Sequence, residues 1–529
     1  MDRRVITVAL TVAVVGVAAA VTLPAIATTT PDRPGGTAAT APAVPAEMLA
    51  ALSRDLNLTS GQARARLARD AWATRTTANL RQTLGTAYAG AWVTNEAPGL
   101  VVAVSDPAAA RTVRAAGARA KPVARSARQL NAMAGAMDAR AAVMRPGVVG
   151  WYVDAPTNSV TVLATRSGMR AARAMVTATG VDPRGVRLVM TDSAPRLLTA
   201  AATPPGLGNG GADQGNGGAD QGNGGNGAGN GNGNNGNGNG NGGGDGSNGN
   251  GNGGGNNGNG NGGAEVRGGD PYIINGQARC SVGFAVTGGF VSAGHCGEEG
   301  SEVTGLGGVV GPQQAVFEAS SFPEDDFSFV ATDDTVTPVG EATAEEGEQG
   351  ANLGPVPVNG AQEAPIGAAV CKFGSTTGVT CGEITALDVT VRFNDPTDGA
   401  GVVAVNGLIG TDVCAEPGDS GGSLLAGDQA QGVVSGGSGN CQQSGETFFQ
   451  PVTEILDTLG VELVTADGDA GAGDAGAGDA GGGAADAGGA GDAAGMNGGG
   501  AAGDGMNNGG MNDGGMNDGG LNGGGMHGG

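Results

Sequence analysis

The pattern of apolar and polar residues divides the chain into two segments that can fold and several that lack the residues for a core. The first folding segment, 45–200, shows helical spacing of apolar residues over 51–84 and again over 128–144, with Thr59 and Ser60 where an N-cap would begin a second helix. Four runs rich in β-branched residues are expected to be strands: 99–106, 147–154, 158–165 and 186–192. Helices between strands predict an α+β domain.

The second folding segment, 265–464, has the pattern of an all-β domain. Short apolar runs are separated by turn residues about every 8–12 positions. Helical spacing is confined to 451–460. This pattern predicts a β-sandwich or a β-barrel.

The other segments are of low complexity. Residues 201–264 are rich in Gly and Asn, and residues 465–529 consist largely of Gly, Ala, Asp, Asn and Met. Neither segment can bury enough apolar surface to offset the entropy of ordering, so we expect a flexible linker and a disordered tail. A lead rich in Pro, Thr and Ala occupies 28–44.

The N-terminus has the features of a secretory signal. Charged residues precede an apolar run from Val5 to Leu23, and small residues follow up to Ala27. We therefore expect residues 1–27 to be removed after Ala27. An uncleaved membrane anchor is the alternative, because the run nearly reaches the roughly 20 residues that a span needs.

Charge is segregated between the two folding segments. Residues 265–464 carry 28 acidic and 4 basic side chains, whereas residues 45–200 carry 20 basic and 9 acidic ones. The acidic balance argues against nucleic acid or an anionic membrane as a partner. It suits solubility outside the cell, and the opposite signs also favour docking of the two segments on each other.

All six cysteines lie in the acidic segment. An even, clustered set in an exported chain predicts three disulfides. A zinc site is the competing interpretation, but the chain has no C-x-x-C pair and only two histidines. We therefore expect neither a metal nor a cofactor. The cysteines are Cys280, Cys296, Cys371, Cys381, Cys414 and Cys441.

The stretch GDSGG at 418–422 contains a candidate nucleophile, Ser420. A serine hydroxyl needs an adjacent base, most often histidine. His527 lies in the predicted disordered tail, so His295 is the candidate base. Asp326, just before an apolar run, could hold the imidazole in the required tautomer. The chain order His, Asp, Ser is that of the chymotrypsin-like arrangement.

Residues 265–464 resemble the secreted bacterial chymotrypsin-fold serine proteases of the streptogrisin and α-lytic protease group. Five stretches carry the resemblance, in the order and at the spacing of that family: CSVGFAVTGGFVSAGHCG, SFPEDDF, FGSTTG, CAEPGDSGGSLL, and SGGSGNC followed by TFFQPV. The resemblance implies two six-stranded antiparallel β-barrels with the site in the cleft between them.

The resemblance also implies a serine endopeptidase and the roles of its residues. His295 would be the general base, Asp326 its orienting carboxylate and Ser420 the nucleophile. The backbone N–H groups of Gly418 and Ser420 would form the oxyanion hole. Asp325, next to the orienting carboxylate, is interpreted as a surface residue.

Further pairings follow from the same resemblance. Lys372 stands where relatives have an arginine that pairs with the aspartate before the nucleophile, so a buried Lys372–Asp419 pair is expected. An exposed lysine is the alternative. The implied disulfides are Cys280–Cys296, Cys371–Cys381 and Cys414–Cys441.

The resemblance also locates the residues that contact substrate. They are Ser435, Gly436 and Gly437, as the edge that pairs with the substrate backbone, and Val434, Thr447 and Phe449, near the primary pocket. Glu446 is the only local carboxylate that could select basic residues, and we expect it to point to solvent instead. Relatives specific for glutamate use a pocket histidine, for which this chain has no candidate. An apolar pocket that accepts Phe, Tyr, Leu or Met is therefore expected, with broad preferences.

Residues 45–200 resemble the pro-region of the same group, most clearly in GLVVAVSD and GWYVDAPTNSVTVLAT. The implication is a folding assistant and inhibitor that is removed by self-cleavage. The linker departs from the family, whose members join the two parts almost directly. Two cleavage sites are possible, one near Leu198 and Thr199 and one near Ala264. The site near Ala264 is favoured for the mature N-terminus.

The predicted protein is a secreted, monomeric serine protease made as a zymogen. Its expected partners are peptide substrates and its own pro-region, with no membrane contact after signal cleavage. Association with the cell wall through the low-complexity segments is a further expectation. One alternative is a catalytically inactive binding protein on the same fold. Another is a cell-surface structural protein in which proteolysis is secondary.

Overall fold

The computed structural model describes residues 45–141, 146–192, 195–198, 200–201, 264–306, 313–344, 353–394, 401–443 and 445–467. All of them lie in the first of the two units into which the chain divides, Met1–Ala472. The predictions for the signal, the lead, most of the linker and the tail concern residues outside these ranges. Within them, no helix combines the length and the apolarity needed to cross a bilayer.

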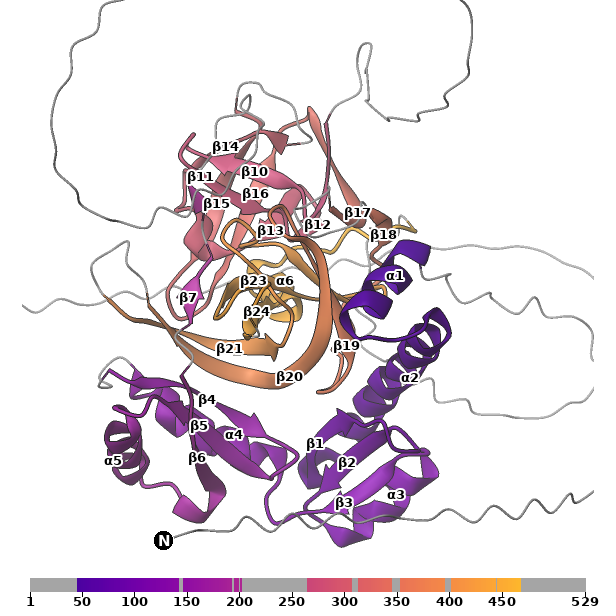
Figure 1. Ribbon diagram of the computed structural model, residues 1–529, viewed down its shortest axis with the longest axis vertical. Helices are drawn as coiled ribbons and strands as arrows, with labels where there is room; N and C mark the ends of the chain where they lie inside the picture. Colours follow the sequence, from indigo (N-terminus) through magenta and orange to yellow (C-terminus); the bar gives the residue numbers. More distant parts are fainter. Residues whose placement is uncertain are drawn as a thin grey trace, which may run out of the picture. The chain divides into compact units, whose positions relative to one another are not determined.

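The pro-region is α+β, as its pattern predicted (Figure 1). The predicted N-cap is confirmed, because the Thr59 hydroxyl accepts a hydrogen bond from the Gln62 N–H and the Gln62 side chain accepts one from the Thr59 N–H. The predicted helix over 128–144 ends earlier, at Asp138. The helices are α1 (Ala46–Asp55), α2 (Ser60–Leu84), α3 (Ala110–Ala115), α4 (Ala127–Asp138) and α5 (Met169–Thr179).

Two groups of three strands accompany these helices. The four predicted strands are confirmed, as β2, β4, β5 and β6, and the pattern missed the short β1 and β3. The first group is β1 (Tyr88–Val93), β2 (Leu100–Val104) and β3 (Arg119–Pro122). The second is β4 (Val148–Asp154), β5 (Ser159–Ala164) and β6 (Val186–Met190).

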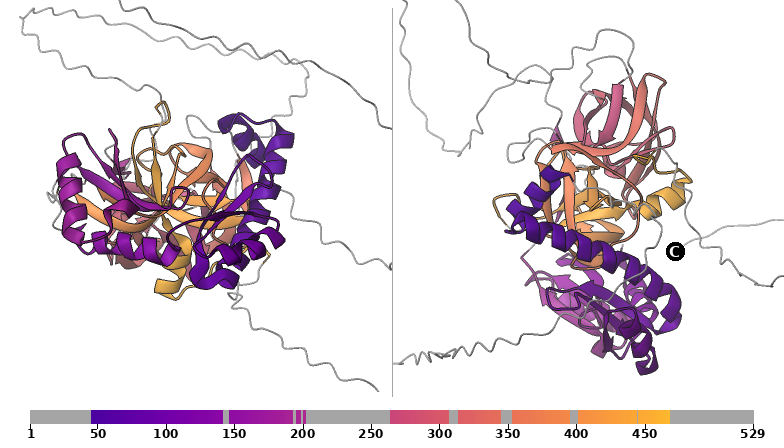
Figure 2. Two further views of the ribbon diagram at one scale, coloured as in Figure 1. Left: turned by 90° about the horizontal axis from the view of Figure 1, so that it is seen from below. Right: turned by 90° about the vertical axis from the view of Figure 1, so that its right-hand side faces the viewer.

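The first half of the second folding segment, which we call the protease region after the family it resembles, is one antiparallel sheet, drawn in rose in Figure 2. Its strands run in the order β12-β13-β16-β15-β14-β10-β11. Val282 and Gly283 interrupt the run between β11 and β12, so one strand of the expected six is divided into two. The rings of Tyr272, Phe290 and Phe317 pack together in its core. The strands are β10 (Pro271–Ile274), β11 (Ala278–Ser281), β12 (Phe284–Val286), β13 (Gly289–Ser292), β14 (Glu302–Thr304), β15 (Ala315–Ser321) and β16 (Phe327–Thr332).

The second half is a closed six-stranded barrel. Its strands run in the order β19-β22-β23-β24-β21-β20, and the pairing of β19 with β20 closes the ring. The predicted C-terminal helix follows as α6 (Val452–Leu459). The strands are β19 (Ala369–Gly374), β20 (Gly378–Phe393), β21 (Val403–Thr411), β22 (Ser423–Ala426), β23 (Gln429–Gly437) and β24 (Thr447–Pro451).

A small sheet joins the start of the protease region to the connection between its halves. β9 (Ala264–Gly268) pairs in parallel with β17 (Val336–Ala344), which pairs in turn with β18 (Leu353–Pro357). The side chain of Val266 is fully buried in the core of the first half. The N-terminal end of the protease region is therefore built into the fold.

Strand β4 of the pro-region extends the second barrel by pairing with β20, at Thr390↔Trp151 and Val391↔Gly150. A Cβ atom at Gly150 would lie 2.3 Å from the Thr390 carbonyl oxygen, so only glycine allows this approach. The carboxylate of Asp138 accepts hydrogen bonds from the Trp151 ring N–H and the Thr390 hydroxyl, at 2.7 and 2.6 Å. The pro-region and the barrel thus share one sheet.

Helix α2 docks on β19 and β20 through a buried carboxylate. Asp70 Oδ2 accepts the backbone N–H of Ala369 at 3.0 Å, and Arg66 and Arg69 flank the same carboxylate. Arg66 also pairs with Glu383 of the protease region at 2.8 Å. Oppositely charged side chains of the two segments are therefore in direct contact, and the backbone pairing of β4 with β20 adds to the docking.

Replacing Asp70 by Ala should weaken this docking. The change leaves a buried N–H and two partly buried guanidinium groups without their shared acceptor, so we expect a loss of about 3 kcal/mol in the stability of the docked state. Thermal unfolding and limited proteolysis of the full chain, carrying Ser420→Ala to prevent cleavage, would measure it. Asp192→Ala, at an exposed carboxylate, is the control. Equal behaviour of the two variants would contradict the assignment.

Candidate active site

The three residues expected to form a triad meet in one hydrogen-bonded row. Asp326 Oδ2 lies 2.8 Å from His295 Nδ1, and His295 Nε2 lies 2.8 Å from Ser420 Oγ. His295 follows β13, Asp326 precedes β16 and Ser420 precedes β22. The row therefore crosses from the first half of the protease region to the second.

Asp326 is fully buried and holds the imidazole at two points. One carboxylate oxygen also accepts the backbone N–H of His295 at 2.9 Å. From the second barrel, the Ser435 hydroxyl donates to Asp326 Oδ2 at 2.5 Å, and the Asp326 N–H donates to Gln450 Oε1 at 2.9 Å. The His295 N–H and the Ser435 hydroxyl therefore satisfy the buried carboxylate, while Gln450 holds the backbone that carries it.

Sequence reasoning missed two of these contacts. Gln450 was not singled out, because a glutamine that follows an apolar strand gives no signal of its own. Ser435 was expected only at the substrate edge, whereas its hydroxyl binds Asp326. Both residues come from the second barrel, more than a hundred positions away from the carboxylate that they contact.

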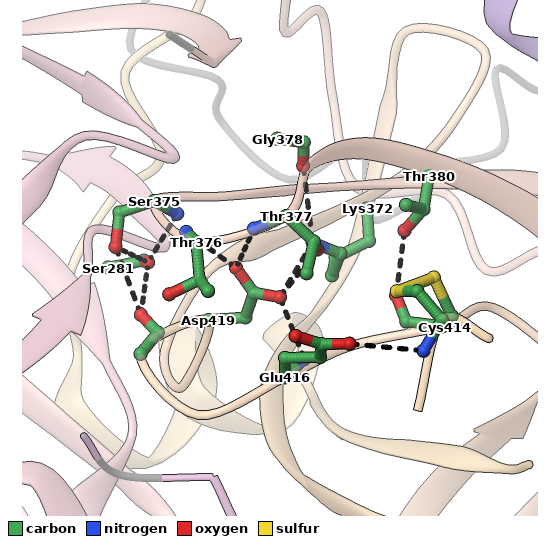
Figure 3. Close-up of polar contacts among 12 residues, drawn as sticks. Ser281, Lys372, Ser375, Thr376, Thr377, Gly378, Thr380, Cys414, Glu416 and Asp419 are labelled. Atoms are coloured by element: carbon green, nitrogen blue, oxygen red, sulfur yellow. Dashed lines mark hydrogen bonds and ion pairs between the residues drawn. A yellow bond between two sulfur atoms is a disulfide. The ribbon is translucent and has the colours of Figure 1, made fainter. Parts of the chain in front are cut away.

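The loop before the nucleophile is fixed around the buried carboxylate of Asp419 (Figure 3). The Thr376 and Thr377 N–H groups donate to Oδ1, at 2.9 and 3.1 Å, and the Thr377 hydroxyl and the Glu416 N–H donate to Oδ2, at 2.6 and 3.0 Å. Lys372 Nζ lies 3.1 Å from Oδ2. Through these contacts the Asp419 carboxylate fixes the position of the loop that directly precedes Ser420.

The expected Lys372–Asp419 pair is thus present and fully buried, which excludes the exposed lysine. Lys372 also donates to the Thr377 hydroxyl at 2.7 Å and to the Gly378 carbonyl at 3.1 Å. Burial raises the pKa of Asp419, but Lys372 and the hydrogen bonds from Thr377 and Glu416 outweigh it, so the pKa lies below its usual value. The carboxylate is therefore ionised at neutral pH.

Gly418 has a φ of +102°, and a Cβ atom there would lie 2.3 Å from Thr376 Oγ1. This conformation and this contact both require glycine. Its carbonyl oxygen accepts the hydroxyls of Ser281 and Ser375, at 2.8 and 3.0 Å, and its N–H has a different partner. That N–H donates to the carbonyl oxygen of Leu198, at the end of the pro-region, at 2.6 Å.

The end of the pro-region crosses the site as an extended strand, β7 (Arg196–Leu197). It pairs antiparallel with β23, at Gly436↔Leu197 and Gly437↔Arg196, so the predicted edge does pair with a peptide backbone. A Cβ atom at Gly436 would lie 2.5 Å from the Arg196 carbonyl oxygen. This coverage leaves the His295 side chain only 2% exposed.

The side chain of Leu198 fills an apolar pocket and is 2% exposed. Its buried cluster includes the predicted residues Val434 and Phe449, together with Val413 and Ala415. Thr447 is also buried, and its hydroxyl donates to the Val413 carbonyl at 2.6 Å. Two of the three predicted pocket residues, Val434 and Phe449, therefore share a buried cluster with Leu198.

Two acidic residues that were expected at the surface, Glu446 and Asp325, are partly buried. Glu446, expected to point to solvent, is partly buried, and burial raises its pKa. Burial also raises the pKa of the Tyr152 phenol in the pro-region, and the charges of Asp154 and Glu446 add to that shift. Asp325 is partly buried as well and accepts a hydrogen bond from the Ser321 hydroxyl at 3.4 Å.

The six cysteines form the three disulfides that the resemblance implied: Cys280–Cys296, Cys371–Cys381 and Cys414–Cys441. The first joins β11 to the turn that carries His295, and the third joins the start of the nucleophile loop to the segment after β23. The described residues contain no group of acidic, His or Cys side chains that could hold a metal ion.

Replacing Lys372 by Met should destabilise the protein more at neutral than at acid pH. The stabilising effect of a lowered pKa is present above the unfolded-state pKa of Asp419 and is lost as the pH falls through the folded-state pKa. At neutral pH the variant buries an unpaired carboxylate, which costs about 3–5 kcal/mol, whereas protonation in acid removes that charge. Melting temperatures at about pH 7 and about pH 3.5 would show the difference, with Lys372→Arg as the control that keeps the charge. A pH-independent loss would instead indicate packing alone.

Comparisons with known proteins agree with this geometry. Residues 61–123 match the alpha-lytic protease pro N-terminal family, residues 125–183 the alpha-lytic protease prodomain, and residues 261–459 the trypsin family. Streptogrisin-C of Streptomyces griseus is 34% identical over 473 residues, which cover 88% of this chain and 85% of the relative. Streptogrisin-D of the same organism is 46% identical over 203 residues, about half of its length.

Among solved structures, the chymotrypsin of Cellulomonas bogoriensis is 49% identical, covers 38% of this chain and 99% of its own, and has a TM-score of 0.33. The two pro-region matches come first along the chain and the protease match follows them. The chain therefore belongs to the streptogrisin and alpha-lytic protease family, and it is a serine endopeptidase with a pro-region.

Proposed function

We propose that this chain is a secreted endopeptidase that processes itself and cleaves peptide bonds after large apolar residues, through an acyl-enzyme on Ser420. One observation carries the proposal. The row Asp326–His295–Ser420 ends where the carbonyl oxygen of Leu198 accepts the Gly418 N–H. A nucleophile, its base and a polarised carbonyl thus occupy one site.

The proposed mechanism follows from the positions of the protons. Ser420 Oγ attacks the substrate carbonyl carbon while His295 Nε2 takes the hydroxyl proton. The tetrahedral intermediate then collapses, the C–N bond breaks, and His295 gives the proton to the leaving amine. Water attacks the acyl-enzyme by the same route and releases the new carboxylate. Asp326 stays ionised and stabilises the imidazolium.

The oxyanion hole is assigned to the N–H groups of Gly418 and Ser420. The 2.6 Å contact from Gly418 to the Leu198 carbonyl supports the first donor, and the second follows from the family resemblance. Removing one donor of this kind typically lowers the rate by about 10²–10³. Because Asp419 fixes the loop from both sides, the donors are oriented before substrate binds.

An apolar preference is supported by Leu198 and its buried neighbours Val434 and Phe449. The three disulfides and the family support secretion, because such bridges persist in oxidising compartments. A signal at 1–27, a monomeric state and attachment to the cell wall stay predictions, as do the boundaries of the linker and the tail.

Labelling with a fluorophosphonate tests the nucleophile. We expect a mass increase on the peptide that contains Ser420 in the processed protein, and none in Ser420→Ala. Asp326→Asn should still fold but lower kcat by about 10⁴, because the imidazole adopts the wrong tautomer. A folded, processed protein that takes up no label would favour the inactive binding protein.

The substrate preference can be measured with peptides that differ only before the cleaved bond. We expect kcat/KM for Leu, Phe or Met to exceed that for Lys or Glu at least about 100-fold, because a charge would be buried in the pocket without a partner. Glu446→Gln serves as the control and should leave this ranking unchanged. A preference for Lys that disappears in Glu446→Gln would show that Glu446 selects basic residues.

A further inference from the structure

The end of the pro-region is held on both sides of Leu198. On one side, the Pro195 carbonyl accepts the Asn394 N–H at 2.9 Å, and β7 pairs with β23. Just beyond Leu198, β8 (Ala200–Ala201) pairs with β11, at Ala278↔Ala201 and Arg279↔Ala200. The chain therefore pairs with the second barrel before Leu198 and with the first sheet after it.

This arrangement singles out one peptide bond. Leu198 has its side chain in the pocket and its carbonyl oxygen on the Gly418 N–H. The bond that follows that carbonyl joins Leu198 to Thr199. Arg196 and Leu197 pair with β23 and Ala200 and Ala201 pair with β11, as the two sides of an extended substrate would pair.

The other candidate junction, at Ala264, is occupied by structure. The Ala264 N–H donates to the Thr335 carbonyl at 2.7 Å, and β9 pairs with β17 from Ala264 onward. Val266 is fully buried, and Arg267 pairs with Glu341 at 2.8 Å. To bring this junction to Ser420, β9 would have to leave its sheet and expose a core residue.

We propose that the first self-cleavage breaks the Leu198–Thr199 bond and that residues 199–263 stay on the protease as an N-terminal extension. The inference rests on the function proposed above. Ser420 Oγ bonds to the Leu198 carbonyl carbon, the C–N bond to Thr199 breaks, and His295 passes the hydroxyl proton to the new Thr199 amine. Water then releases the carboxylate of Leu198. The mature chain begins at Thr199 and not at Ala264.

The experiment is a time course of the full chain, followed by N-terminal sequencing and intact mass. The first new N-terminus should read Thr-Ala-Ala-Ala-Thr, and Ser420→Ala should give no cut. A first product that begins near Ala264 overturns the inference. A Thr199 terminus in Ser420→Ala also overturns it, because another protease would then make the cut.

Variants at the two junctions sharpen the test. Leu198→Asp should slow the cleavage at least about 100-fold, because it places a charge in the apolar pocket. Leu198→Met should be cleaved at close to the wild-type rate, because methionine also fits an apolar pocket. The comparison of the two variants separates binding in the pocket from an effect on folding. Ala264→Asp, the matched change at the other junction, should leave the first cut unchanged. If Leu198→Asp is cleaved at the wild-type rate, the inference is overturned. It is also overturned if Ala264→Asp is not cleaved while Leu198→Asp still is.

Fluorophosphonate labelling of the same samples separates the two proposals. Protein that labels at Ser420 but starts near Ala264 retains the proposed function and loses only the inference. Protein that is neither cut nor labelled loses both, because the nucleophile itself is then inactive.

Discussion

The buried carboxylate of Asp419 is the constraint on which the active site depends. Four hydrogen-bond donors and the Lys372 ammonium group converge on it, and each fixes part of the chain around Ser420. A charge with no exposure to water is stable only when all its partners are present. The loop therefore has one conformation, in which Gly418 directs its N–H toward the cleft and its carbonyl toward Ser281 and Ser375. An oxyanion site needs this orientation in advance.

A second carboxylate joins the two halves of the protease region. Asp326 belongs to the first half, as does His295, but Ser435 and Gln450 approach it from the second. The catalytic row is therefore complete only when the halves are packed against each other. The end of the pro-region spans the same boundary, since β7 pairs with the second barrel and β8 with the first sheet. Occupation of the cleft and assembly of the site are coupled in this chain.

The sequence predicted what depends on local pattern and on motif. The helices over 51–84 and 128–144 and four strands of the pro-region could be named in advance from local pattern. The triad could be named from its motifs, and the pairing of the three disulfides and the Lys372–Asp419 pair could be named from the family resemblance. The pairing of β4 with β20, of β7 with β23 and of β8 with β11 could not. These contacts use backbone groups that every residue carries, between segments separated by up to several hundred positions. Only Gly150 and Gly436, where a Cβ atom would meet a carbonyl oxygen, mark them in the sequence, and a chain with 108 glycines hides that signal.

The length of the connection between the two folding segments has a structural consequence. If Leu198 were joined directly to the protease region, the residues after the cleaved bond would have to form both the second half of a bound substrate and strand β9. Here Ala200 and Ala201 take the first role and Ala264–Gly268 the second. Closing a longer loop adds only about 0.6 kcal/mol for each doubling of its length, so the insertion is tolerated. Strand β9 can therefore keep its hydrogen bonds and its buried Val266 through the cut, and the protease domain need not rearrange when its pro-region leaves.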